Sequence, residues 1–482
     1  MSLTSALNNA ISGLTSTSRM AEVVSSNLSN ALTDGYGKRA VELSSVQVGN
    51  VGGGVQVVSI NRFVDAGILA DRRLADAALT GQQDTVNTLT RLEQSIGGIG
   101  DENGLSAKLA AFENALISAA TDPASETRLV DVFNSLEGVA ETLKSNTRDV
   151  QTLRQDADQA IANDVQSLNM ALKQVEDLNK DILRMQGSGN DVSALLDARQ
   201  VAVDEVSAIV PVRQIDRDNG TIGLITTTGA TLLDGQAVEF DFSATPTITA
   251  DMTFSSGALG GIMLNGAPID SGSGIGRLDG GSLGAAFTMR DDTLVAVQQS
   301  LDEIAVDLIA RFEDPSTDPT LTAGDIGLLT DEGGALDLGD IPGLAGRISV
   351  NALVDPNKGG NLRLLRDGIN SVTAGPSGNA AQLNSWLDAL DIARADVPGG
   401  VSLSAIGRVA NFTAEVGSVR LSAEEQLSFT AARWDTLREA ELANGVDTDI
   451  ELQTLMRVEQ AYAANAKVLE AADFMMQRLM EI

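Results

Sequence analysis

The chain opens with LTSALNNAISGLTSTSRMAEVVSSNLSNA, residues 3–31, in which small and apolar residues recur every seven positions. One row consists of Leu7, Leu14, Ala21 and Leu28, and the second consists of Leu3, Ala10, Thr17, Val24 and Ala31. Two such rows are typical of a helix that packs against a partner helix. The pattern stops at residues 34–37, DGYG, where glycine allows the chain to reverse.

The last segment of the chain repeats this pattern. One row consists of Leu455, Tyr462, Leu469 and Met476, and the other of Val458, Asn465, Ala472 and Leu479. Residues 444–449, NGVDTD, precede it and supply acidic and hydroxyl side chains that can cap a helix. Either stripe alone is also typical of an amphipathic helix on its own domain. Two matching stripes at opposite ends favour paired terminal helices with surface left for other subunits.

This pairing predicts an assembly interface made of Leu7, Leu14, Leu28, Leu455, Val458, Tyr462, Asn465, Leu469, Met476 and Leu479. Asn465 has two interpretations. A buried amide in such a seam fixes register and partner number, whereas an exposed amide contacts only solvent or its own backbone.

In the middle of the chain, the residue pattern changes from helical to strand-like and back to helical. Helical periodicity covers residues 105–186, with a break at Asp122-Pro123, and continues over about 191–209. Residues 211–283 carry hairpin-type turns at 218–220, 234–235 and 265–266 between short Ile, Val, Thr and Phe runs. A helical pattern returns at 284–312, residues 313–382 have no clear pattern, and helices resume from about 383.

These segments predict an α+β multidomain protein. We expect a terminal coiled-coil domain from residues 1–35 with 447–482, and a helical-bundle middle domain from 36–210 with 284–446. Residues 211–283 form the inserted β-rich domain. A chain whose first and last helices pair brings its ends together and projects its middle away from them.

Composition excludes several classes of function. The chain has 33 Lys plus Arg against 66 Asp plus Glu and contains no dense basic run, so we expect no nucleic-acid partner. Cys and His are both absent, which removes thiol nucleophiles, His-based acid–base catalysis and Cys or His metal sites. No uncharged segment is apolar enough to predict a membrane span or a cleaved signal peptide.

The remaining candidate sites have simpler explanations. Gly272, Gly274 and Gly276 lack the Gly-Lys-Ser/Thr ending of a phosphate loop, so we expect a turn. Residues 314–325 are acidic but lack the glycine and terminal glutamate of an EF-hand, which predicts a solvated loop. Gly52, Gly53 and Gly54 are interpreted as a flexible entry to a strand. We therefore predict no catalytic residue, cofactor or metal.

Both ends of the chain resemble a known protein family. Residues 8–14 (NNAISGL), 26–30 (SNLSN) and 34–36 (DGY) resemble the N-terminal signature of flagellar rod, hook and hook-associated proteins. Residues 445–447 (GVD) and 459–469 (EQAYAANAKVL) are similar to the partner signature at the C-terminus. Ser26-Asn27 stands where the family commonly has a double Asn, and Gly37-Lys38-Arg39 replaces a more usual polar-Arg-Gln run. Neither departure touches the helical seams.

Three interior stretches resemble one branch, the hook-associated protein 1 family, whose members form the junction between hook and filament. They are residues 195–199 (LLDAR), residues 281–284 (GSLG) with 289–291 (MRD), and residues 348–351 (ISVN) with 355–356 (DP). The resemblance implies a secreted, extracellular structural protein of the flagellum that leaves the cell by flagellar type III export. It also implies self-association, contacts with the hook protein and with the next hook-associated protein or filament side, and a cytoplasmic export chaperone bound through the C-terminal helix.

Two other functions remain as alternatives at this stage. A hydrolase needs two carboxylates roughly 5–10 Å apart in a cleft, and no spacing in the chain singles out such a pair. An extracellular adhesin would instead bind a ligand through residues 211–283 alone.

Overall fold

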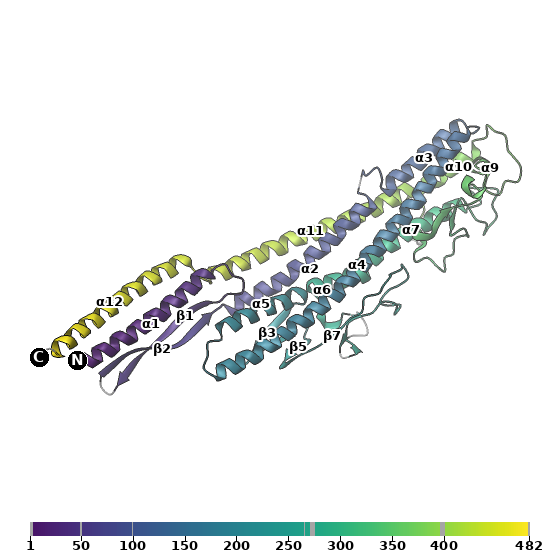
Figure 1. The fold of residues 1–482 in the computed structure, drawn as a ribbon. Coiled ribbons are helices and arrows are strands. Elements are labelled where there is room, and N and C mark those ends of the chain that lie inside the picture. The colour runs from purple at the N-terminus through teal and green to yellow at the C-terminus, as the bar shows by residue number, and fades with distance from the viewer. Residues whose placement is uncertain are drawn as a thin grey trace.

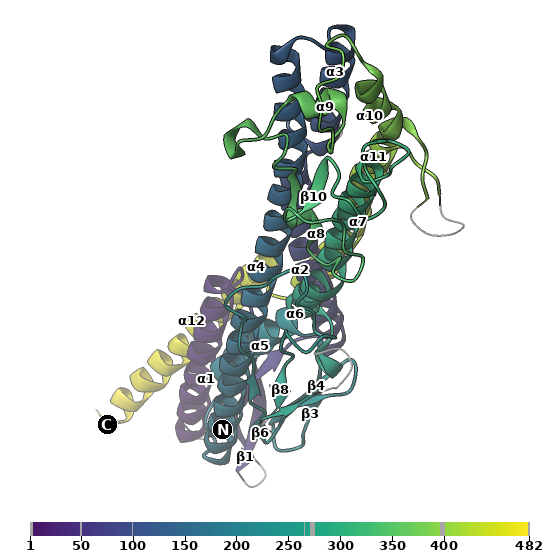
Figure 2. The same cartoon turned by 90° about the vertical axis from the view of Figure 1, so that its right-hand side faces the viewer.

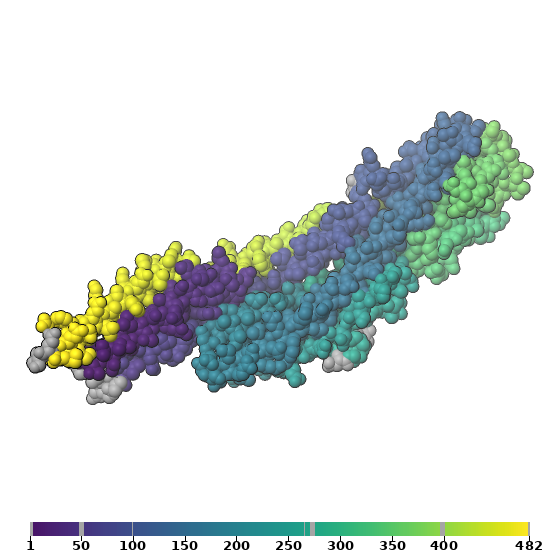
Figure 3. Space-filling view, in the orientation of Figure 1, coloured from purple at the N-terminus to yellow at the C-terminus, as the bar shows by residue number. Residues whose placement is uncertain are grey.

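The computed structural model describes residues 3–48, 51–98, 100–264, 266–269, 275–395 and 401–480. The molecule is elongated and built mainly of long helices, and the first and last helices lie together at one tip (Figure 1). The space-filling view shows the same arrangement, with the two end segments side by side at that tip (Figure 3).

The terminal helices pair, as predicted. Helix α1 (Leu3–Ser29) and helix α12 (Thr448–Met480) pack along each other and run in opposite directions (Figure 1). A two-stranded antiparallel hairpin, β1 (Lys38–Val48) and β2 (Val51–Phe63), packs on α1 as well. We call α1, the turn that follows it, the hairpin and α12 the terminal unit, and the remainder of the molecule the body.

Long helices form the frame of the body. Helix α4 is the longest, with 62 residues, and the break before it at Asp122-Pro123 is the one that the sequence predicts. The two views of the fold show these helices lying roughly along the long axis of the molecule (Figures 1 and 2). The main helices of the body are α2 (Ala66–Ile96), α3 (Leu105–Thr121), α4 (Glu126–Gly187), α5 (Ser193–Ile209), α6 (Gly281–Thr288), α7 (Leu294–Phe312), α10 (Ala381–Asp391) and α11 (Ala405–Ala443).

The predicted β-rich region is confirmed as two small antiparallel sheets against α4. One has the order β3-β4-β5-β6, with turns at 217–221 and 235, and the other has the order β7-β8-β9. Asn265, Gly272 and Gly274 lie outside the described residues. The strands are β3 (Val212–Asp216), β4 (Ile222–Thr226), β5 (Thr231–Asp234), β6 (Gln236–Ala237), β7 (Phe240–Asp241), β8 (Met263–Leu264) and β9 (Ala267–Pro268).

The segment without a clear sequence pattern forms short elements at the end of the molecule far from the termini, beside α3 and α7. Strands β10 and β11 pair there in antiparallel fashion. The short elements are β10 (Leu329–Asp331), α8 (Leu344–Arg347), β11 (Ile348–Val350), η3 (Pro356–Lys358) and α9 (Arg363–Asp367). Elsewhere, the 3-10 helix η1 (Gly276–Leu278) precedes α6, and the π-helix η2 (Met289–Thr293) follows it.

Two apolar cores hold the body together, and α4 serves both. Its residues between Leu129 and Ala157 enter the first core, and those between Ile161 and Val175 enter the second. In the first core, Phe112, Phe312 and Trp386 meet edge to face, with ring centroids 6.2 and 5.4 Å apart. Among the described residues, neither core includes a side chain of the terminal unit.

Helix α2 and strand β1 were not predicted from the sequence. Helix α2 has Asp65 as its N-cap, and the Asp65 carboxylate accepts hydrogen bonds from the backbone N–H of Gly67 and Ile68. The hairpin contradicts the expectation that Gly52, Gly53 and Gly54 form a flexible entry to a strand, because these glycines lie inside β2. The division into domains placed residues 36–63 with the helical middle, and the structure packs this segment on α1.

The acidic segment 314–325 is also more ordered than a solvated loop. Asp318 is fully buried, and its carboxylate accepts hydrogen bonds from the backbone N–H of Thr320 and Ile369. This carboxylate fixes the local backbone because each buried N–H needs an acceptor.

Candidate assembly interface

The register between α1 and α12 is fixed by two contacts. The side chain of Asn465 lies directly over Gly13, where an added Cβ would sit only 2.6 Å from its Nδ2 atom. Further along, the Asn27 side chain donates a hydrogen bond of 3.1 Å to the Glu451 carboxylate. The two contacts are fourteen residues apart on each helix, so the same faces meet over four turns. Asn465 therefore lies in the seam, half-buried, and Gly13 leaves the room it needs.

Asn27 joins three segments of the terminal unit at one buried point. Its amide nitrogen donates to the Arg39 carbonyl at 2.8 Å and to Glu451. Its amide oxygen accepts from the Tyr36 hydroxyl at 2.8 Å and from the Arg39 backbone N–H at 3.0 Å. Asn27 thus makes four hydrogen bonds, which link α1 to the turn at 34–37, to β1 and to α12.

Glu451 carries a charge into this buried position. Its side chain is 5% exposed, and its second carboxylate oxygen lies 3.1 Å from the Lys38 ammonium. A buried charge is tolerated where it is paired and hydrogen-bonded. The Lys38 and Asn27 contacts supply both conditions, so the start of α12 is tied to the start of β1.

The hairpin approaches α1 closely on its other side. Gly54 in β2 has φ +98°, and a Cβ there would lie 2.1 Å from the Ser12 hydroxyl. The same hydroxyl accepts a hydrogen bond of 3.2 Å from the Val55 backbone N–H. Only glycine satisfies both the backbone conformation and the close approach at this position.

The structure divides the predicted interface residues into two groups. Val458 is buried, and six others are half-buried in the terminal unit: Leu7, Leu14, Leu28, Leu455, Asn465 and Leu469. Tyr462, Met476 and Leu479 are exposed by 49%, 38% and 66%. The first group is at least half covered within one chain, and the second group remains exposed.

The outward residues belong to a larger apolar surface on α12. We call it the α12 apolar surface, and it comprises Ile450, Leu452, Met456, Tyr462, Val468, Phe474, Met475, Met476, Leu479 and Met480. Phe474 and Met480 are exposed by 59% and 80%. Large exposed apolar surfaces are uncommon on proteins that act alone and mark sites of association. Sequence periodicity found only part of this surface, because Phe474 and Ile450 lie outside the two heptad rows.

The interior stretches singled out by the sequence have packing roles. The backbone of Gly281, at the start of α6, approaches α2 at Gly81, where an added Cβ would lie 2.5 Å from the Gly281 carbonyl oxygen. Asn351 donates to the Gly327 carbonyl at 2.7 Å from the end of β11. Arg290 is fully buried and pairs with Asp158 at 2.6 Å and with Asp291 at 2.7 Å.

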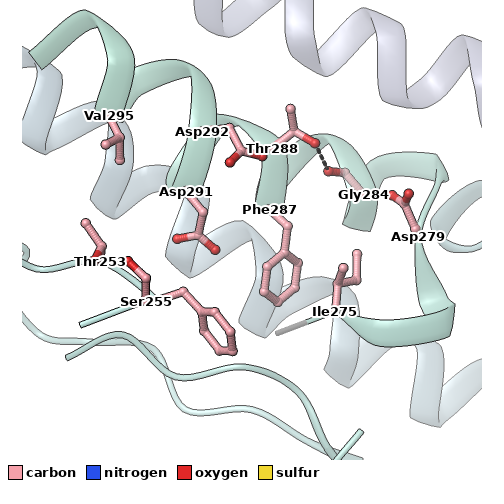
Figure 4. A pocket seen from close by; sticks show the side chains of 11 residues that line it. Thr253, Ser255, Ile275, Asp279, Gly284, Phe287, Thr288, Asp291, Asp292 and Val295 are labelled. Carbon is pink, nitrogen blue, oxygen red and sulfur yellow. Dashed lines mark hydrogen bonds between the residues drawn. The ribbon is translucent and has the colours of Figure 1, made fainter. Parts of the chain in front are cut away.

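A pocket of about 420 Å³ lies beside the Arg290 pair. Figure 4 shows Phe287 and Asp291 pointing into it, while the Thr288 hydroxyl donates to the Gly284 carbonyl within the helix. The Asp291 carboxylate already accepts hydrogen bonds from Nε and Nη2 of the Arg290 guanidinium, at 2.9 and 2.7 Å. The pocket therefore presents a carboxylate that is engaged in holding the fold.

Two other kinds of feature are absent from the described part of the chain. Within it, no group of three or more acidic side chains is placed to hold a metal ion. None of its helices combines the length and the apolar character that crossing a bilayer requires.

Comparison with known proteins agrees with this architecture. Residues 89–327 match the family described as the flagellar hook-associated protein FlgK helical domain, and residues 443–482 match the flagellar basal body rod FlgEFG protein C-terminal family. The first match covers most of both body cores, and the second covers α12.

Curated relatives match over different lengths. Flagellar hook-associated protein 1 of Salmonella typhimurium is 28% identical over 324 residues, which cover 64% of this chain and 56% of the relative. The protein of the same name from Bacillus subtilis is 22% identical over 94% of this chain and 93% of the relative. The chain thus spans just over half the length of the Salmonella relative.

One solved structure is also similar, that of the flagellar hook junction protein FlgK from Burkholderia pseudomallei. The match has 17% identity and a TM-score of 0.44, and covers 54% of this chain and 46% of that one.

Paired terminal helices, together with these two family matches, define an axial-type protein of the bacterial flagellum. Within that class, the chain is similar to flagellar hook-associated protein 1, FlgK, in its helical body and in its curated relatives.

Proposed function

We propose that this protein is a structural component of the flagellum that forms the junction between hook and filament. Copies associate through the terminal unit, and the role involves no catalysis. The observation that carries the proposal is the α12 apolar surface, which remains exposed although α12 is already paired with α1. An apolar face left uncovered inside one chain supplies the driving force for association between chains.

The partners are proposed from the resemblance to the hook-associated protein 1 family. We propose that α1 and α12 contact neighbouring copies, the hook protein on one side and the next hook-associated protein or the filament on the other. Before assembly the α12 apolar surface needs a cover, and a cytoplasmic export chaperone that binds the C-terminal helix would provide it. The assembled protein is then secreted and extracellular.

Localisation on cells tests this proposal directly. Antibodies against the body, detected by electron microscopy on whole cells, should label the boundary between hook and filament. Cells that lack the protein should carry hooks without attached filaments, and the wild-type chain should restore them. Label spread along the filament, or normal filaments in the deletion strain, would contradict the proposal.

A paired set of variants connects the phenotype to the surface. Leu479→Asp places a charge on the exposed apolar surface and should abolish filament attachment while leaving the free chain folded. The matched control is Glu470→Asp, a change at an exposed, already charged position of the same helix. Filament attachment that survives Leu479→Asp would show that this part of α12 lies outside the interface.

A further inference from the structure

Two arginines face each other on the hairpin of the terminal unit. Arg39 in β1 and Arg62 in β2 are direct cross-strand partners. Like charges in opposite positions on neighbouring strands destabilise a hairpin. Such a pair needs an anion between the two guanidinium groups, and the chain supplies one from a distant helix.

That anion is Asp197 of α5. Its Oδ2 atom accepts a hydrogen bond of 2.6 Å from Arg39, and its Oδ1 atom accepts one of 2.7 Å from Arg62. The backbone N–H of Gly37 also donates to Oδ1, at 3.0 Å. All three donors belong to the terminal unit, whereas Asp197 belongs to the body. One carboxylate therefore connects the two parts of the molecule.

Helix α5 is held firmly on the body side. Val203 and Val206 are fully buried in the second core. Arg199, two residues beyond Asp197, donates to the Asn179 side chain at 2.9 Å and to the Gly220 carbonyl at 2.8 Å. Burial lowers the pKa of Arg199 to about 10, so this group still carries its charge at neutral pH. The carboxylate thus projects from a rigid support.

Few other contacts bridge the two parts, and one of them, a hydrogen bond from Arg62 to the Gln200 side chain of α5, lies beside the same carboxylate. Among the described residues, neither apolar core crosses from the body into the terminal unit. A second ion pair, between Asp34 and Arg438, also bridges them, but the Asp34 side chain is 81% exposed. Exposed pairs contribute little because water and salt screen them. The Asp197 side chain, by contrast, is only 16% exposed.

Beside the contact between Asp197 and the two arginines, the terminal unit and the body are separated by a groove. It has a volume of about 670 Å³ between β2 and the segment from Gln186 to Leu196, which joins α4 to α5. On this side, the terminal unit therefore contacts the body at the Asp197 site, and the groove separates β2 from the body next to that site.

We propose that Asp197 is the positioning residue that sets the orientation of the terminal unit relative to the body. The carboxylate holds Arg39 and Arg62 together and, through them, fixes the hairpin and α1. Loss of this charge leaves both parts folded but frees the angle between them. This property belongs to the single chain, so its test is independent of the proposed role in the flagellum.

The absence of cysteine in the chain makes a distance measurement straightforward. Ser44 in the hairpin and Ser167 in α4 are both exposed. Spin labels on Ser44→Cys and Ser167→Cys report the distance between terminal unit and body, measured by pulsed electron paramagnetic resonance. The wild-type pair should give one narrow distance distribution at low salt. Asp197→Asn should broaden or split it, because the amide keeps the shape but cannot neutralise two guanidinium groups.

Salt and matched variants distinguish positioning from simple destabilisation. About 1 M salt, where the screening length is about 3 Å, should broaden the wild-type distribution and change the Asp197→Asn distribution much less. Arg62→Gln should reproduce the Asp197→Asn result. Asp156→Asn, which removes an exposed ion pair with Arg91 inside the body, should change nothing. Melting of the body should be the same in all four proteins.

Two results would overturn the proposal. One is a spin-label distance distribution in Asp197→Asn that has the same width and the same mean distance as that of the wild type. The other is a wild-type distribution that is already broad at low salt.

Discussion

Asn27 and Glu451 show how single residues of the terminal unit connect segments that are far apart in the sequence. Asn27 makes four hydrogen bonds at a buried position, and Glu451 pairs there with both Asn27 and Lys38. The cost of removing such a residue comes mainly from the partners that it leaves unpaired.

We therefore expect Asn27→Ala to destabilise the terminal unit by about 1–3 kcal/mol. Amide hydrogen exchange should accelerate in α1, the hairpin and the first turns of α12, while the body cores keep their protection. The exposed Asn8→Ala on the same helix serves as the control and should leave exchange unchanged. Equal exchange in the two variants would mean that the Asn27 contacts do not hold the unit together.

Glu176 makes a second residue-scale prediction, on acid stability. Hydrogen bonds from Lys180, the Ala237 backbone N–H and Lys173 lower the pKa of Glu176 from 4.5 to about 2. Because the folded value lies below the unfolded one, the stabilisation is present above about pH 4.5 and is lost as the pH falls toward 2.

Glu176→Gln should accordingly be less stable than the wild type above this window, and the difference should shrink as the pH falls through it. Urea unfolding at a series of pH values measures this. Glu137→Gln, at an exposed position of the same helix, should show no such trend. A constant difference between wild type and Glu176→Gln at all pH values would contradict the assignment.

Residue types alone indicated seam positions on the terminal helices but not which partner each residue meets. The heptad rows located Val458 and Asn465, and both lie toward α1. The same rows could not distinguish the half-buried Leu469 from the exposed Leu479, because each is a Leu in one of the two seam rows. That distinction depends on the register of the helix pair: Leu3, the first residue of α1, lies opposite Met475, so Leu479 lies about one turn beyond it.

At the scale of elements, α12 has two faces with different roles, and a pair of variants separates them. Leu469→Asp places a carboxylate in the half-buried seam and should destabilise the α1–α12 pair of the free chain. Leu479→Asp lies on the exposed face and should leave the free chain unchanged. Hydrogen exchange of α1 in the free protein measures both, and similar exchange in the two variants would show that the seam does not protect α1.

Element prediction failed where burial does not follow a simple period. The hairpin has side chains that are mostly half-buried or exposed on both faces, so its strands lack the apolar alternation that marks a half-buried strand. Its three consecutive glycines point to a loop, yet Gly54 is required by the close approach of Ser12. That requirement arises from tertiary packing, which local sequence does not encode.

For the whole molecule, the separation of the cores from the terminal unit predicts that the body folds alone. A fragment of residues 64–443 retains every buried side chain of both cores and the Asp65 cap of α2. It should melt in one cooperative transition and remain monomeric, because it lacks the α12 apolar surface. Calorimetry and light scattering measure these properties. A broad transition, or aggregation at low concentration, would show that the terminal unit is needed to complete the body.

The single helix that serves both cores has a mechanical consequence. Bending the body between its cores would require breaking α4, so the body behaves as a stiff beam and compliance is concentrated where the terminal unit begins. A helix of 62 residues is about 93 Å long, and a rotation of roughly 10° about one end moves the other by about 16 Å. The Asp197 carboxylate, where the terminal unit meets the body, therefore controls displacements far larger than the lengths of its own hydrogen bonds.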